Sequence, residues 1–298
     1  MTRVAVLGLG EAGRTFAAGI AGALEVRGWD PADPPAVPGV ERVASAAAAV
    51  AGAEAVLAFA PAAHAAAALD AALDALGAGT AGGPGVLYAD FSTAAPALKR
   101  ELAGRAGAAG LHFADVAIMA PVRRGAANTP LMASGPAAAA LAALLGDAGL
   151  RVQVIAGQVG EAAARKLLRS MLVKGLTGVM IESLRAAERE GLDDWFGPHL
   201  VATLTSLDRA TLAGLVDGTR LHAARRVDEM EAAARMTEQA GGHAEIARAV
   251  AALLRSVEAE GVPGTLDGAG VPGTLRAVDA PASGAGRPSG ERGGSVRA

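Results

Sequence analysis

Three polar residues spaced four apart mark the stretch of this sequence best suited to chemistry. Lys166, Ser170 and Lys174 recur at helical spacing, so they share one face of the helix that we expect over residues 157–190. An amine and a hydroxyl on one face suit acid–base work, although a lysine on a helix is more commonly solvated. We expect this helix to join two domains and to present Lys166 to the cleft between them.

A second candidate site lies at the start of the chain. Arg3–Leu7 is a β-branched run typical of a buried parallel strand, and it is followed at once by Gly8-Leu9-Gly10-Glu11-Ala12-Gly13 and then a helix. Gly8 suits the turn, Gly10 lets backbone approach a pyrophosphate, and Gly13 lets helix and strand pack closely. Chance is the alternative in a chain with 40 glycines, but the strand–turn–helix context favours dinucleotide binding.

Strand ends supply the other candidate cofactor residues. Asp30 ends the second predicted strand, where a carboxylate can accept the ribose hydroxyls of NAD and repel the 2′-phosphate of NADP. A turn at Asp30-Pro31 is the alternative. The strands ending at Ala60-Pro61 and before Thr93 should also face the cofactor, though Ser92 and Thr93 equally suit caps of the helix over 96–108.

The loop over residues 119–130 is the candidate substrate loop. It begins at Met119 and carries Arg123 and Arg124, a pair that can hold a carboxylate through two parallel hydrogen bonds. A solvated arginine pair is the alternative. Lys174, one turn beyond Ser170, is the other candidate for an anionic group of the substrate, or for a salt bridge.

The pattern of elements predicts an α/β protein. We expect a doubly wound Rossmann sheet, a long interdomain helix and a small all-α C-terminal domain. The expected domains are residues 1–156, 157–261 and a disordered tail over 262–298, which is rich in Gly, Pro, Ser and Arg. We predict helices over 40–50, 193–214, 221–236 and 244–259. His222, Arg225, Arg226 and Glu229 are expected to form a salt-bridged surface, with a contribution to the site as the alternative.

Composition excludes several classes of function. Aromatic residues make up 3% of the chain and the net charge is −3, which argues against nucleic-acid binding. The absence of cysteine excludes disulfides, thiolate metal sites and a cysteine nucleophile, and we expect no metal site. With no signal peptide and no long run of bulky apolar residues, we expect a cytoplasmic protein without a membrane span.

These motifs occur in the order seen in one family. The fingerprint, the strand end at Asp90-Phe91-Ser92-Thr93 and the segment from Gly157 to Lys166 resemble the β-hydroxyacid dehydrogenases, which include 3-hydroxyisobutyrate and 6-phosphogluconate dehydrogenases. Within that superfamily, residues 166–226 resemble a subgroup whose phosphogluconate dehydrogenase C-terminal-like domain has unknown function. The resemblance covers about residues 3–260. It departs from the family at Ser170, where asparagine is usual, and at Met119-Ala120-Pro121, which replaces a Ser-Gly-Gly loop.

The resemblance implies an NAD(P)-dependent oxidoreductase acting on a small β-hydroxy acid or related alcohol. Lys166 would be the general acid/base and Ser170 would orient the substrate oxygen. NAD is the expected cofactor, with NADP as the alternative. The competing functions are an imine or ketone reductase, whose members typically lack the lysine, and a non-catalytic nucleotide sensor. Apolar residues such as Met171, Leu172, Val179 and Met180 predict a homodimer.

Overall fold

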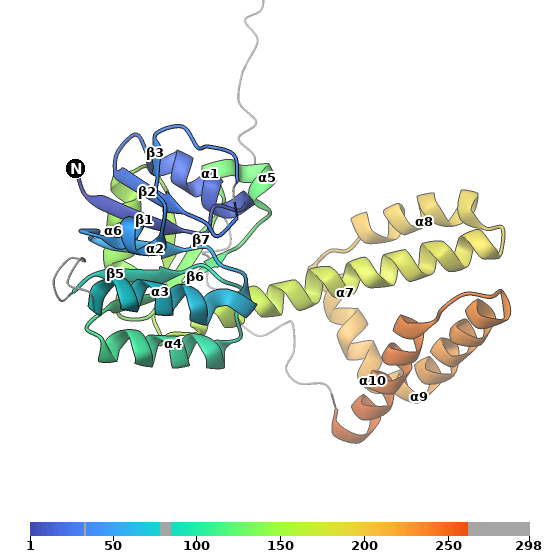
Figure 1. The fold of residues 1–298 in the computed structure, drawn as a ribbon. Coiled ribbons are helices and arrows are strands. Elements are labelled where there is room, and N and C mark those ends of the chain that lie inside the picture. Colours follow the sequence, from blue (N-terminus) through green and yellow to red (C-terminus); the bar gives the residue numbers. More distant parts are fainter. Residues whose placement is uncertain (33, 78–84, 262–298) are drawn as a thin grey trace, which may run out of the picture. The chain divides into compact units, whose positions relative to one another are not determined.

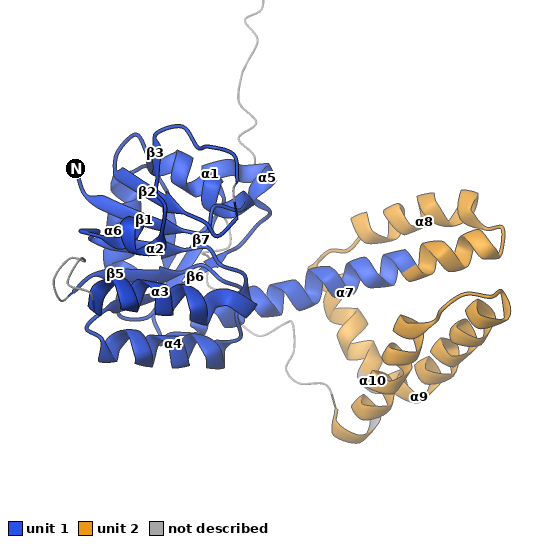
Figure 2. Ribbon diagram, in the orientation of Figure 1, with its two compact units in different colours: residues 1–181 blue, residues 182–298 orange. Residues whose placement is uncertain are grey.

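The structure is a computed structural model, and it describes residues 1–32, 34–77 and 85–261. The chain divides into two compact units, residues 1–181 and 182–298 (Figure 2). The predicted tail over 262–298 lies outside the described residues. None of the described helices is both long and apolar enough to cross a membrane.

Unit 1 is built on an eight-stranded sheet with the order β3-β2-β1-β4-β5-β6-β7-β8 (Figure 1). The strands are β1 (Arg3–Leu7), β2 (Glu25–Trp29), β3 (Val40–Arg42), β4 (Ala55–Ala58), β5 (Leu87–Asp90), β6 (His112–Ile118), β7 (Leu131–Ser134) and β8 (Val152–Val154). All neighbours are parallel except β6 and β7. The chain order reverses between β1 and β4, which is where a doubly wound sheet opens its ligand crevice.

Alternate residues of the central strands serve two separate cores, which is why these strands are apolar throughout. Val4 and Val6 of β1 pack with helices α1 (Glu11–Ile20) and α6 (Ala138–Asp147). Ala5 and Leu7 point to the other face. That face is covered by α2 (Ala46–Val50), α3 (Ala65–Gly77) and α4 (Pro96–Ala108).

Short elements complete unit 1, and the long helix α7 (Glu161–Arg189) begins in it. The short elements are η1 (Ala62–His64), α5 (Val122–Gly125) and η2 (Ala126–Asn128). The helix predicted over 40–50 is wrong in its first part, because residues 40–42 pair with β2 as an edge strand and only residues 46–50 are helical. Ser45 caps that helix through its side-chain oxygen.

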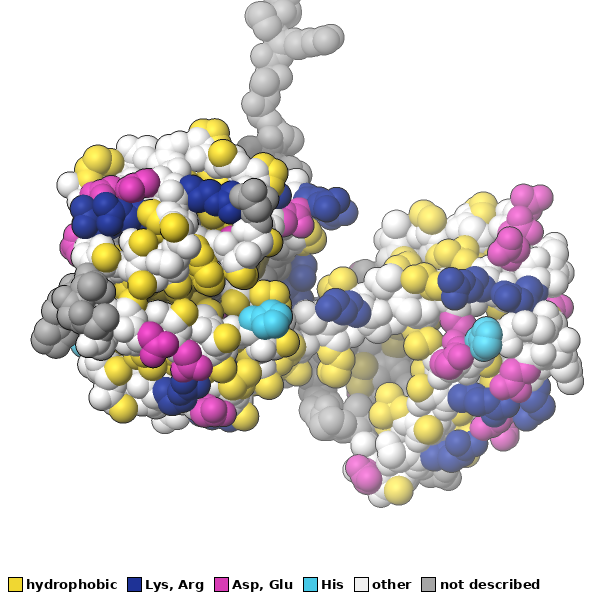
Figure 3. All heavy atoms as spheres, in the orientation of Figure 1, with side chains coloured by type: hydrophobic (Ala, Val, Ile, Leu, Met, Phe, Trp, Pro, Cys, Tyr) yellow, Lys and Arg dark blue, Asp and Glu magenta, His cyan; other side chains and the backbone are white. Residues whose placement is uncertain are grey.

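Unit 2 contains the end of α7 together with α8 (Asp193–Thr205), α9 (Arg209–Gln239) and α10 (Glu245–Glu260). The helix break predicted between residues 214 and 221 lies at His222, whose non-helical backbone (φ −131°, ψ 25°) divides α9 into two helical parts. The single helix predicted over 193–214 is wrong, because α8 ends at Thr205 and α9 begins at Arg209. The face drawn in Figure 3 shows intermixed basic and acidic side chains on this unit. One ion pair of this unit joins Arg248 Nη2 and Glu238 Oε2 at 2.6 Å. The α/β class, the Rossmann sheet, the long helix and the helical C-terminal region are thereby confirmed.

Candidate functional site

The glycine loop after β1 has the geometry that a dinucleotide requires. Gly8 has φ +97°, a conformation that side chains rarely adopt, and a Cβ there would lie 3.0 Å from the backbone of Phe59. A Cβ on Gly13 would come within 1.9 Å of the Gly8 carbonyl oxygen, so α1 packs on the turn only because residue 13 has no side chain. A Cβ on Gly10 would meet nothing within 4 Å, because this residue faces open space.

The N-terminus of α1 is free to bind an anion. Gly10 is the capping residue of α1, and no side chain caps the helix there within the described part of the chain. The first N–H groups of a helix have no partner inside it and carry partial positive charge. The loop therefore fits the pyrophosphate of a dinucleotide, as the sequence predicts.

Asp30 is placed to support this loop from β2. Its carboxylate Oδ2 accepts the Leu9 N–H at 2.6 Å and its Oδ1 accepts the Ala32 N–H at 2.8 Å. The contact with Ala32 is the turn that the sequence offered as the alternative for this residue, whereas the contact with Leu9 was not predicted. The side chain also lines the adjoining cleft, so it borders the space where the ribose is expected.

The cleft beside this loop has a volume of about 540 Å³. It lies at the carboxyl ends of β1, β2 and β4, at the reversal point of the sheet. The residues that line it include Gly8, Gly10, Trp29, Asp30, Ala60, Pro61 and His64. His64 belongs to η1, the short helix that follows β4, and sequence reasoning did not place it at this cleft.

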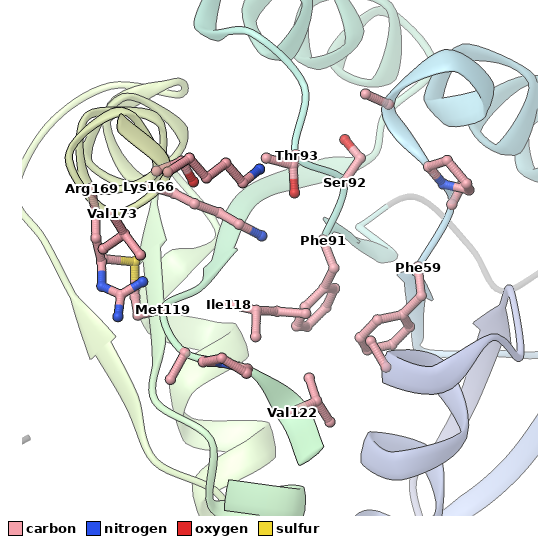
Figure 4. A pocket seen from close by; sticks show the side chains of 18 residues that line it. Phe59, Phe91, Ser92, Thr93, Ile118, Met119, Val122, Lys166, Arg169 and Val173 are labelled. Carbon is pink, nitrogen blue, oxygen red and sulfur yellow. The ribbon is translucent and has the colours of Figure 1, made fainter. Parts of the chain in front are cut away.

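A second cavity of about 690 Å³ contains the predicted catalytic residues (Figure 4). Lys166, Ser170 and Lys174 line it from α7, as their common face requires. Thr93 and Ser92 line it from the loop after β5, and the lining also includes Ala12, Met119, Ala120, Pro121 and Val122. Phe59, Ala60 and Pro61 line both cavities, so the cleft and the lysine cavity are adjacent.

Aromatic rings form one wall of the lysine cavity. Phe59 and Phe91 stack with their ring centres 4.2 Å apart, and Phe16 packs behind Phe59 at 5.7 Å. Ile118, Val122 and Val173 extend the apolar lining. Phe59 and Phe91 thus form an apolar wall that can exclude water from a reacting centre.

The predicted substrate arginine is not at the cavity. Arg123 pairs through its Nε with Glu11 Oε1 at 2.7 Å, and its side chain is 86% exposed. Arg123 and Arg124 are absent from the lining, and the cation that is present instead is Arg169. Sequence reasoning missed Arg169, although its position three residues after Lys166 places it on a neighbouring part of the same helical face.

The amine of Lys166 has an altered acidity. Burial disfavours the ammonium and, together with the positive charges of Lys99 and Lys174, lowers the pKa of Lys166 to about 8. The carboxylates of Asp115 and Asp90 oppose this change. A lysine with a pKa near 8 can both release and accept a proton near neutral pH.

The residues that hold α7 in place come from the sheet. Asp90, Asp115 and Ser134 are neighbours in register across β5, β6 and β7, and all three are buried. Asp115 Oδ2 accepts the N–H groups of Gly160 and Ala163, each at 3.0 Å. Sequence reasoning missed this contact, which joins residues 45 to 48 positions apart.

The charged residues predicted as a surface in the C-terminal region form local pairs. Arg225 Nε lies 3.3 Å from Glu229 Oε1, and both side chains are exposed. Arg226 donates to the carbonyl of Leu215 and to the Thr219 hydroxyl, across the kink at His222. All of these contacts lie within α9, so Arg225 and Arg226 are explained by contacts inside the helix and need no bound ligand.

Two family models match the sequence. Residues 3–156 match the NAD binding domain of 6-phosphogluconate dehydrogenase, and residues 187–257 match a domain of unknown function, DUF1932. These matches confirm the predicted relationship and the nicotinamide dinucleotide cofactor. No curated protein matches the chain.

Solved structures share the fold over most of the chain. A conserved hypothetical protein from Sinorhizobium meliloti is 28% identical, with a TM-score of 0.54, over 87% of this chain and 89% of its own. Conserved protein MTH1747, described as similar to 3-hydroxyacid dehydrogenases, is 25% identical, with a TM-score of 0.54, over 87% and 99%. A reductive aminase from Aspergillus terreus in complex with NADPH and ethyl levulinate is 19% identical, with a TM-score of 0.68, over 89% and 96%, and it shows the fold alone.

Proposed function

This chain belongs to the family of the NAD binding domain of 6-phosphogluconate dehydrogenase, and from that premise we propose that it is an NAD(P)-dependent dehydrogenase acting on the CH–OH group of a small β-hydroxy acid or related alcohol. The observation that carries the proposal is the adjacency of two cavities. The glycine loop lines one, Lys166 lines the other, and Phe59, Ala60 and Pro61 line both.

Several residues of the chain have distinct roles in the proposed reaction. The nicotinamide, when bound, supplies the hydride acceptor in oxidation and the hydride donor in reduction. Lys166 Nζ takes the proton of the substrate hydroxyl in one direction and returns it in the other. Ser170, one turn along α7, donates or accepts a hydrogen bond at the substrate oxygen and orients it. Phe59 and Phe91 keep water from the reacting carbon.

The charge of the lysine cavity supports an acidic substrate. Three cations line it, namely Lys166, Arg169 and Lys174, and the lining contains no carboxylate. Lys166 is assigned to proton transfer, so Arg169 and Lys174 are left to pair with an anionic group of the substrate. Met119-Ala120-Pro121 offers fewer backbone donors than a Ser-Gly-Gly loop, since Pro121 has none, and this supports recognition of the anion by α7.

The experiment that tests the proposal is a titration with NADH and, separately, with NADPH. Trp29 lines the cleft, so its emission should be quenched on binding, and the variant Trp195→Phe removes the only other tryptophan of the chain. Tighter binding of NADH supports the role of Asp30 and justifies a screen of hydroxy acids with Lys166→Ala as the control. No binding of either cofactor by folded protein would overturn the proposal.

A reductase of C=N or C=O bonds is the second candidate function. The observation that favours it is the apolar wall of Phe59, Phe91, Ile118, Val122 and Val173, which suits an uncharged substrate. Lys166 argues against it, because the imine reductases that resemble this family typically lack that lysine. Turnover of imines that survives Lys166→Ala would favour this candidate over the hydroxy-acid dehydrogenase.

We also propose that the active form is a homodimer. Leu168, Met171 and Leu172 of α7 are 63%, 70% and 69% exposed, and Leu176 and Val179 continue the stripe. A contiguous apolar stripe of this length is uncommon on a monomer. A second copy offers the same stripe, which a twofold axis can bring into register with the first.

A further inference from the structure

A buried lysine lies beneath the first turn of α7. Lys99 of α4 has 0% exposure, and its ammonium has three partners. It lies 2.9 Å from Asp90 Oδ2 and 3.2 Å from Asp115 Oδ1, and it donates to the Asp90 carbonyl oxygen at 2.8 Å. Two carboxylates are therefore brought together in the interior around one cation, an arrangement that is stable only while every charge keeps its partners.

The second oxygen of Asp115 holds α7. Asp115 Oδ2 accepts the N–H groups of Gly160 and Ala163 and the hydroxyl of Ser134. Ser134 Oγ in turn accepts the Ala162 N–H at 3.1 Å. The N–H groups that a helix leaves unpaired at its start are thus satisfied by side chains of the sheet, and a negative charge sits at the positive end of the helix.

We propose that Lys99 is a positioning residue for Lys166, through its contact with Asp115 and through its own fixed charge. Lys166 lies three residues beyond Ala163 on the same rigid helix, so whatever fixes the first turn fixes the origin of its side chain. This inference rests on the proposed role of Lys166 in proton transfer, and it adds three residues that do not line the lysine cavity: Lys99, Asp115 and Ser134.

The charges that surround Lys166 come from three other elements and from its own helix. Lys99 of α4 opposes its protonation, as does Lys174 of α7, while Asp115 of β6 and Asp90 of β5 favour it. Burial has the largest effect on the pKa of Lys166, and Lys99 has the next largest. Removing Lys99 should therefore raise the pKa of Lys166, and removing Asp90 should lower it slightly.

The test measures the reactivity of the Lys166 amine without any substrate. Only a free amine reacts with acetic anhydride, so the rate of acylation against pH reports the protonation of each lysine. The chain has three lysines, at 99, 166 and 174, which makes their assignment by mass spectrometry direct. Lys174 serves as the internal reference in every sample.

Lys99→Met should move the acylation profile of Lys166 to higher pH, with a rate near neutral pH lower by about three- to tenfold. Asp90→Asn should move it by a smaller amount to lower pH. Simple structural damage would expose Lys166 to water and move both profiles to higher pH, so shifts in opposite directions support the proposal. Two profiles that move the same way, or a profile that Lys99→Met leaves in place, would overturn it.

Amide hydrogen exchange in the same variants tests whether Lys99, through Asp115, fixes the first turn of α7. Exchange at Gly160, Ala162 and Ala163 should be faster in Lys99→Met, because Asp115 then lacks its cation. Arg105→Met is the matched control, since it removes a positive charge from the same helix at an exposed pair with Asp70. Exchange that is unchanged in folded Lys99→Met protein would overturn that role of Lys99.

Folding is monitored by thermal unfolding, because Lys99→Met leaves two carboxylates without their cation. Should that variant not fold, Lys99→Met combined with Asp90→Asn removes one charge of each sign, and Lys166 should still react more slowly near neutral pH. Failure of this inference is distinct from failure of the proposed function. Acylation and exchange test the network alone, whereas the role of Lys166 is tested by turnover of Lys166→Ala.

Discussion

Lys166 has a partly buried amine in a cavity next to the cofactor cleft, and its lowered pKa predicts how activity depends on pH. With a pKa of about 8, the free amine forms as pH rises through that value. Alcohol oxidation needs the free amine as base, so kcat/KM should rise with pH and level off above about 8. Reduction needs the ammonium as acid and should fall over the same interval. The pH profile in each direction checks this.

Replacement of Lys166 should separate chemistry from binding. Lys166→Ala should reduce turnover by about 10²- to 10⁴-fold, the usual contribution of a general acid or base, while NADH affinity stays within about twofold. Lys174→Ala is the matched control, because Lys174 lines the same cavity from the same helix, and it should raise KM more than it lowers kcat. Full turnover in Lys166→Ala would contradict the assigned role.

The carboxylate of Asp30 is expected to set the preference for NADH over NADPH. Asp30→Asn keeps an oxygen for the Leu9 N–H, gives up the contact with the Ala32 N–H and removes the negative charge that opposes a 2′-phosphate. The preference for NADH over NADPH, measured as a ratio of dissociation constants, should fall by about tenfold. Asp30→Ala removes the contact with Leu9 as well, so it should weaken both cofactors. An unchanged ratio in Asp30→Asn would remove Asp30 from cofactor selection.

At the scale of the element, the strand–turn–helix unit at the start of the chain assigns different tasks to its glycines. Gly13→Ala would drive a Cβ into the Gly8 carbonyl, and we expect it to destabilise unit 1 by about 3 kcal/mol. Gly10→Ala meets open space, so stability should change by less than about 0.5 kcal/mol while cofactor binding weakens by about tenfold or more.

Thermal unfolding and cofactor titration measure these two effects separately. Gly104→Ala is the matched control, since it lies inside α4 with open space around it and should affect neither cofactor binding nor folding adversely. A Gly10→Ala protein that binds NADH normally would contradict the assignment of this residue to the pyrophosphate.

Local pattern was sufficient for the elements but not for the contacts between them. Glycine spacing, strand ends and helical period predicted the crevice and the shared face of Lys166, Ser170 and Lys174, because each depends on neighbours in the sequence. The strand at Val40–Arg42 was not predicted, because a three-residue edge strand is defined by its pairing with β2. The ion pairs of Lys99 were not predicted either, because the two carboxylates that it contacts come from separate strands.

At the scale of the whole molecule, the exposed stripe on α7 predicts a concentration-dependent assembly. Leu172→Glu should weaken a homodimer by about 30-fold for each copy, since burial of a leucine is worth about 2 kcal/mol and each copy loses one. Sedimentation over a range of concentrations measures this. Val154→Glu is the matched control, as an exposed apolar residue of β8. Wild-type protein that stays monomeric throughout would contradict the proposed dimer.

The capping of α7 by Asp115 and Ser134 also has a consequence for the order in which the molecule folds. The first turn of this helix depends on side chains that lie 28 to 48 residues earlier in the chain. Those side chains come together only when β6 and the antiparallel β7 are paired, and such non-local contacts form late, since the intervening loops must first be closed. A nascent or partly folded chain therefore has the lysine but not its environment, and the reactive form of Lys166 arises only once the sheet has been assembled correctly.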